Sequence, residues 1–161
     1  MIEIERIGTA AGSAGCQLLS TLHAACFRPH WSEAEIGRLV AAPGTLAVVA
    51  SHPLTDGAGT RPAGMAICFS AGAEAEILTL GVIPDCRRAG VAARLVSECC
   101  LMATDAGTAQ LFLEVAADNN AALALYRGRG FRQVGRQENY YGPRNNRSTS
   151  KDALILRLDL T

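Results

Sequence analysis

The sequence lacks net charge, a long apolar run and a leader-like N-terminus. Its 15 basic and 15 acidic side chains cancel, so no overall field favours nonspecific binding to nucleic acid or an anionic membrane. No stretch approaches the roughly 20 apolar residues that a membrane-spanning helix needs. The opening MIEIERIG has no basic segment followed by an apolar one, as a signal peptide would have. We expect a cytoplasmic protein with no membrane partner and no specific nucleic acid.

The six cysteines lack the spacing of a disulfide framework or a zinc site. There is no CxxC pair and no ladder of His and Cys ligands, and Cys99 and Cys100 are neighbours in an expected helix. We expect reduced thiols, mostly buried. The three histidines form no HExxH-like pair, so they are interpreted as bystanders and no metal site is expected.

The usual phosphate-binding motifs are also missing. Neither GxxxxGK[ST] nor a GxGxxG after a strand occurs, but RRAGVA stands at 87–92, where a strand-like run meets a helical one. A helix beginning near Gly90 exposes its first amides, and its dipole attracts phosphate. Gly90 permits close approach, Ala92 is small, and Arg87 and Arg88 can donate charge-assisted hydrogen bonds. The segment suits a diphosphate; the alternative is an ordinary turn with two solvated arginines.

Hydrophobic periodicity predicts a mixed sheet covered by helices. The 49% apolar composition can form one core, so we expect a single domain over residues 1–161. Strands are predicted at 1–7, 45–51, 63–70, 76–83, 110–115, 131–137 and 153–160. Helices are predicted at about 10–27, from the N-cap Ser32 to near Pro43, at 90–106 and at 119–128. Their order favours an α/β or α+β mixed fold.

Two longer segments carry a more specific resemblance. LTLGVIPDCRRAGVAARLV, with its R-x-x-G-x-A core, resembles the acetyl-coenzyme A (acetyl-CoA) loop of the GNAT acetyltransferases. LFLEVAADNNAALALYRGRGF resembles the corresponding stretch of the RimI-type protein N-terminal alanine acetyltransferases, and HWSEAEI, ENYY and DALILRL continue the match. The resemblance is strong from about Glu76 to Leu158. It implies the GNAT fold: a central, mostly antiparallel mixed sheet of about seven strands with a splayed parallel pair, flanked by about four helices.

The resemblance also implies acetyl-CoA as co-substrate, and no metal. The strand Leu78–Val82 would splay from Leu111–Val115, leaving backbone groups near Leu80 and Val82 for the pantetheine amides. Asn119 matches an asparagine near the CoA arm, with helix capping as the alternative. The implied cofactor-binding residues are Leu80, Val82, Arg87, Arg88, Ala89, Gly90, Val91, Ala92, Ala93 and Asn119.

Glu114 and Tyr126 match the catalytic residues in the RimI-like pattern LEV…N…ALY. This match implies a general base, acting through water, and a general acid. From the residues alone, Glu114 lies in a strand expected to be buried, where a carboxylate needs a task or a partner. It could instead sit at the exposed end of that strand, and Tyr126 could simply fill the core. Covalent catalysis by Cys86 is less favoured, because phosphate would occupy the positive field there.

Trp31, Tyr140 and Tyr141 are expected to line the acceptor groove. The alternatives are a strand-end aromatic pair for the two tyrosines and, for Trp31, a side chain that packs against the start of the helix.

The favoured function is acetyl transfer from acetyl-CoA to a protein N-terminus, namely the alanine of a bacterial small-subunit ribosomal protein, by direct attack in a ternary complex. Another protein N-terminus, a polyamine or a drug amine remains open as the acceptor. A different function, that of a CoA-binding module without turnover, also remains open. The oligomeric state is open, with a monomer favoured.

Overall fold

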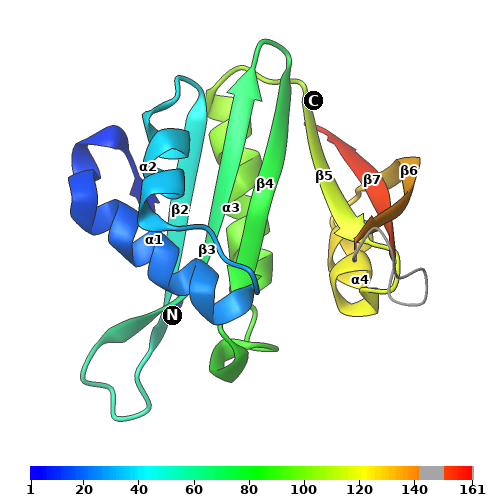
Figure 1. Ribbon diagram of the computed structural model, residues 1–161. Coiled ribbons are helices and arrows are strands. Elements are labelled where there is room, and N and C mark those ends of the chain that lie inside the picture. Colours follow the sequence, from blue (N-terminus) through cyan, green and yellow to red (C-terminus); the bar gives the residue numbers. More distant parts are fainter. Residues whose placement is uncertain (142–150, 161) are drawn as a thin grey trace.

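The computed structural model describes residues 1–141 and 151–160, which form one seven-stranded sheet (Figure 1). Its order is β1-β2-β3-β4-β5-β7-β6, and only β4 and β5 run parallel. The strands are β1 (Glu3–Ile7), β2 (Thr45–Pro53), β3 (Thr60–Ala71), β4 (Glu74–Val82), β5 (Gln110–Ala116), β6 (Arg132–Tyr141) and β7 (Lys151–Asp159). The predicted mixed sheet with one parallel pair is confirmed.

In the described part of the chain, four α-helices cover the two faces of the sheet (Figure 1). They are α1 (Gly12–Cys26), α2 (Glu33–Ala41), α3 (Val91–Asp105) and α4 (Asn120–Gly128), with short 3-10 turns η1 (Thr9–Ala11) and η2 (Pro84–Cys86). The apolar side chains of α1 and α2 pack with β1, β2 and β3 in one core. Those of α3 and α4 pack in a second core that includes β4, β5 and β7. No helix in these parts of the chain is long and apolar enough to cross a membrane.

Helix α2 starts where its N-cap was predicted. The Ser32 hydroxyl accepts a hydrogen bond from the Glu35 amide at 3.1 Å, and the Glu35 carboxylate accepts one from the Ser32 amide at 2.7 Å. This reciprocal pair satisfies two backbone donors at the start of the helix. These hydrogen bonds lower the pKa of Glu35, because they favour its ionised form.

Strands β4 and β5 pair over only four residues before they part. The register runs from Glu74 opposite Gln110 to Ile77 opposite Leu113, whereas β4 continues along β3 to Val82. The register of β3 and β4 shifts at the same level, leaving Leu78 as an extra residue in β4. Such a bulge bends a strand and increases its twist. Figure 1 shows the two strands diverging toward their carboxyl ends, as the resemblance implied.

Candidate active site

The divergence of β4 and β5 opens a cleft of about 1410 Å³. Its lining includes the second half of β4, the end of β5, the loop before α3 and one side of α4. The end of α1 and the start of α2 contribute further residues. Ligands of α/β proteins commonly bind in such a crevice, beyond the carboxyl ends of parallel strands.

The start of α3 offers backbone donors to this cleft. Gly90 is the N-cap with φ 84°, and no side chain caps the helix. Within residues 1–141 and 151–160, the six amides from Arg88 to Ala93 donate to no backbone or side-chain acceptor. The Arg94 amide is the first that donates a hydrogen bond, to the Gly90 carbonyl oxygen at 3.1 Å. Unsatisfied amides at a helix N-terminus form an anion-binding site. A pyrophosphate group fits this arrangement.

The two arginines before the helix differ in their surroundings. The Arg87 Nε donates a hydrogen bond to the Val82 carbonyl oxygen at 3.0 Å, so this side chain ties the loop to the end of β4. The Val82 carbonyl expected to meet pantetheine therefore already accepts one hydrogen bond. Arg88 is exposed and holds a positive φ of 64°, which is uncommon outside glycine. Both arginines line the cleft.

Most of the residues predicted to bind the cofactor lie in the cleft lining: Leu80, Val82, Arg87, Arg88, Gly90, Val91, Ala92, Ala93 and Asn119. Ala89 is exposed and lies outside that lining. Asn119 also has the capping role that the sequence left open, because its Oδ1 accepts a hydrogen bond from the Ala122 amide at 3.2 Å. The structure thus brings nine of the ten positions to one cleft.

Glu114 and Tyr126 line the same cleft in contrasting environments. Strand β5 buries Leu111, Leu113 and Val115, but the Glu114 side chain points to the opposite, exposed face. The strand is buried on one face as expected, and Glu114 is exposed, which agrees with the alternative that the sequence left open. Tyr126 is 7% exposed, and its ring packs edge-on against that of Phe131, with 5.5 Å between the ring centroids. The phenol is held by packing, while the carboxylate stays accessible to water.

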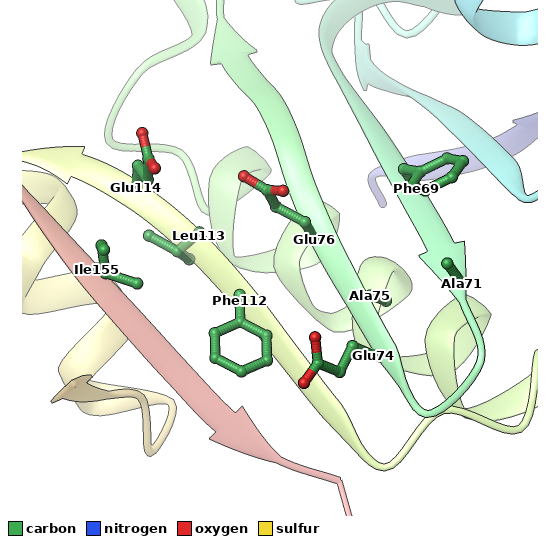
Figure 2. Close-up of a pocket in the computed structure, with 9 residues that line it drawn as sticks. All are labelled: Phe69, Ala71, Glu74, Ala75, Glu76, Phe112, Leu113, Glu114 and Ile155. Carbon is green, nitrogen blue, oxygen red and sulfur yellow. The ribbon is translucent and has the colours of Figure 1, made fainter. Parts of the chain in front are cut away.

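A second cavity of about 380 Å³ lies on the sheet face over β4, β5 and β7 (Figure 2). Glu76 from β4 and Glu114 from β5 extend into the gap between their strands in this view. Three residues, Glu76, Leu113 and Glu114, line both this cavity and the larger cleft. Burial and the charge of Glu114 raise the pKa of Glu76. Sequence reasoning missed Glu76; the available signal was a charged residue inside the apolar run AEILTL.

The lining of the cleft near α1 and α2 contains Trp31, from the segment between these helices, and His23 from α1. The His23 Nδ1 accepts a hydrogen bond from the Trp31 amide at 3.0 Å, and the two rings stack at 4.7 Å. Burial, with a smaller effect of His30, lowers the pKa of His23, so the ring remains a neutral acceptor near pH 7. The ring of His23 lines the cleft and holds the backbone of Trp31 in place. The side chains of Tyr140 and Tyr141, and residues 142–150, lie outside the described residues.

The thiols are poor candidates for a covalent mechanism. All six cysteines are free; Cys68, Cys86 and Cys99 are buried, and the other three are partly buried. Burial raises the pKa of Cys26, which lines the cleft, despite the nearby Arg87. A hydrogen bond with Cys68 and burial raise the pKa of Cys99. The reactive thiolate is therefore disfavoured at Cys26 and Cys99. In the described part of the chain, no group of three or more His, Cys, Asp or Glu residues could hold a metal ion.

Comparison with known proteins agrees with this geometry. The chain is 40% identical over 86 residues to "N-alpha-acetyltransferase RimI" of Mycobacterium tuberculosis, a match covering 53% of this chain and 49% of that protein. It is 35% identical over 88 residues to "[Ribosomal protein bS18]-alanine N-acetyltransferase" of Escherichia coli K12, covering 55% of this chain and 57% of that protein. The chain thus spans about half the length of the curated relatives that it matches.

The whole fold has a solved counterpart. The crystal structure of the ribosomal-protein-S18-alanine N-acetyltransferase from Escherichia coli superposes with a TM-score of 0.81 at 25% identity, covering 100% of this chain and 95% of that one. The described fold is therefore the GNAT fold. Residues 16–131, which contain the parted strands, the α3 amides, Glu114 and Tyr126, match the acetyltransferase (GNAT) family, and the chain belongs to this family.

Proposed function

We propose that this protein transfers an acetyl group from acetyl-CoA to the N-terminal α-amine of a protein. The observation that carries the proposal is one cleft that joins unsatisfied helix amides at Arg88–Ala93 to Glu114 and Tyr126, in a chain of the GNAT family. The names of both relatives favour an α-amine as acceptor, and the name of the Escherichia coli relative favours the alanine of a ribosomal protein. Direct attack within a ternary complex is part of the proposal.

Acetyl-CoA, when bound, supplies an acetyl group activated as a thioester. The amides from Arg88 to Ala93 would bind its pyrophosphate, assisted by the α3 dipole and by the guanidinium groups at the cleft. Among the described residues, the edge of β4 from Leu78 to Val82 has no strand partner on the β5 side, so its backbone can pair with the amides of the pantetheine arm. This mode of binding extends a sheet with an additional strand-like ligand.

The exposed carboxylate of Glu114 suits an α-amine acceptor. An α-amino group has a pKa near 7.7–8.0, so its deprotonation at pH 7 costs about 1 to 1.4 kcal/mol, whereas a lysine near 10.4 would cost about 4.6 kcal/mol. The acceptor enters as an α-ammonium with three N–H protons. Glu114 accepts one of them, through water, which leaves the neutral amine that attacks the thioester. Tyr126 donates its proton to the departing sulfur. As the N–C bond forms and the C–S bond breaks, the second amine proton returns to the Tyr126 oxygen, which balances the reaction.

The acceptor class is tested by mass spectrometry of purified protein incubated with acetyl-CoA. The acceptors are a peptide beginning with alanine, the same peptide with a blocked N-terminus and an internal lysine, and a polyamine. We expect acetylation of the free N-terminus alone. Transfer only to the polyamine would support the alternative of a small-amine acetyltransferase. Binding of acetyl-CoA without transfer to any amine would support a CoA-binding module.

The role of Glu114 is tested by Glu114→Gln. The amide cannot take the proton, so we expect kcat to fall by about 10- to 100-fold, at or below the low end of general base effects, because an α-amine needs little help. Steady-state kinetics at pH 7 and pH 9 measure the change. The deficit should shrink at pH 9, where the α-amine is already neutral. An equal deficit at both pH values would contradict the assignment.

A further inference from the structure

Two cavities meet at a pair of carboxylates on adjacent strands. The cleft that would hold the cofactor and the smaller cavity in Figure 2 share only Glu76, Leu113 and Glu114 among their lining residues. We propose that Glu76 of β4 is a positioning residue that binds the α-ammonium of the acceptor together with Glu114 of β5. This inference rests on the proposed function, and it specifies how the acceptor amine is recognised.

The register places both side chains where one ammonium can reach them. Glu76 is opposite Phe112 in the parallel pair, and Glu114 follows two residues later on the same face of β5. Diagonal neighbours of this kind lie within reach of long side chains. In Figure 2 the two carboxylates extend into the same gap, while Glu74 lies at the start of β4 beside Phe112. The pair thus marks the point where an acceptor amine would meet the thioester.

The charge of this pair is not balanced by the described residues around it. Neither carboxylate has a recorded hydrogen bond or ion pair with another described residue. The cation on the neighbouring strand, Arg157 opposite Phe112, lies 3.2 Å from the Asp159 carboxylate. Burial and, to a smaller extent, the charge of Glu114 raise the pKa of Glu76, which agrees with the proximity of the two carboxylates in Figure 2. A bound ammonium would relieve this repulsion and donate hydrogen bonds to both carboxylates, since it carries three donors.

Position, not acidity alone, distinguishes Glu76 from its neighbour. Glu74 lies on the same strand and the same face and is also exposed, but it lines only the smaller cavity. It is therefore a matched control for local negative charge. If Glu76 orients the amine, Glu76→Gln should weaken acceptor binding and Glu74→Gln should not.

The experiment combines kinetics with binding. For Glu76→Gln we expect the KM for an alanine-first peptide to rise about tenfold or more, as a hydrogen bond to a charged group warrants, with the KM for acetyl-CoA unchanged. Glu76→Asp, which keeps the charge with a shorter reach, should recover part of the affinity. Glu74→Gln should behave as wild type. Thermal denaturation of each variant checks that the fold is retained.

Isothermal titration in the presence of CoA isolates the amine. The peptide and its des-amino analogue, in which hydrogen replaces the α-amine, are titrated into wild type and Glu76→Gln. We expect the variant to lose affinity for the amine peptide but not for the analogue. An unchanged KM and affinity in Glu76→Gln, or an equal loss in Glu74→Gln, would overturn the inference.

The same experiment separates this inference from the proposed function. Wild type that acetylates the peptide while Glu76→Gln is unaffected would refute only the role of Glu76. Wild type that binds acetyl-CoA but acetylates no peptide would refute the proposed function. In that case the titrations still decide whether Glu76 recognises the ammonium, because they require no turnover.

Discussion

At the scale of single residues, Glu114 and Tyr126 differ in the surroundings that suit their proposed roles. Glu114 faces the open side of β5, where water can carry a proton to it. Tyr126 is 7% exposed and packed against Phe131, and its phenol carries an O–H donor. A carboxylate is then available as acceptor and a phenol as donor in the same cleft. This division is what an acyl transfer to an amine requires.

Tyr126→Phe tests the proposed proton donor. The variant keeps the ring that contacts Phe131, so the melting temperature should stay close to that of wild type, while kcat should fall about 100-fold or more through loss of the acid. Steady-state kinetics and thermal denaturation measure the two effects. An acetyl thioester with a more acidic thiol should restore much of the rate, because its thiolate leaves without a proton. A wild-type rate under conditions where chemistry limits turnover would exclude the assignment.

The residues predicted from the sequence are those with a recognisable local pattern. Glu114, Tyr126 and the loop before α3 belong to contiguous motifs, and these residues line the cleft except for Ala89. Glu76 was not predicted from the sequence, because its proposed role depends on Glu114, which lies on a strand far away in the sequence. The hydrogen bond from Arg87 to the Val82 carbonyl depends on how the loop folds back, which residue type alone does not specify.

At the scale of elements, the start of α3 depends on backbone conformation. Arg88 and Gly90 both have positive φ, and the helix begins without a side-chain cap. A capping oxygen would compete with phosphate for the same amides. A Cβ at Gly90 would find Ile2 Cδ1 at 4.0 Å, so the position has room. The strain of a left-handed conformation, and not a clash, therefore favours glycine there.

Gly90→Ala tests this dependence. An L-residue in the left-handed region costs about 1 to 2 kcal/mol, so the variant should be less stable and should bind acetyl-CoA more weakly as the amides shift. Gly57→Ala is the matched control: Gly57 has φ 72° and open space around its Cα, but it lies in the β2–β3 hairpin. It should lose similar stability and keep its affinity. Titration calorimetry and thermal denaturation compare the two, and equal affinity losses would contradict the role of Gly90.

The extent of correct prediction differs between helices and strands for a physical reason. Helix ends carry local signals, so Ser32 and Gly90 marked the starts of α2 and α3 correctly. Strand ends depend on their neighbours: β4 begins at Glu74, two residues before the predicted start. The bulge at Leu78 arises from the pairing of β4 with β3. The sequence does not signal it, because the nearest glycine, Gly81, lies three residues later.

At the scale of the whole molecule, the cleft separates two parts of one sheet. On one side, β1 to β4 pair continuously; on the other, β5, β7 and β6 do so. The two parts share the short register between Glu74–Ile77 and Gln110–Leu113, together with the apolar core beneath α3 and α4. A ligand that pairs with β4 and reaches α4 would contact both parts, so its binding should stabilise the molecule as a whole.

Acetyl-CoA is therefore expected to raise the melting temperature. A ligand at 100 times its Kd stabilises the native state by about 2.7 kcal/mol, which corresponds to about 5 to 11 °C for a domain of this size. Hydrogen exchange should slow at the Arg88–Ala93 amides and along Leu78–Val82, and not in the β2–β3 hairpin. Scanning calorimetry with and without ligand measures the first effect, with Gly90→Ala as a control that should need more ligand for the same shift. If the melting temperature rose while exchange at Arg88–Ala93 stayed unchanged, acetyl-CoA would be bound elsewhere, and the cleft between β4 and β5 would lose its proposed role.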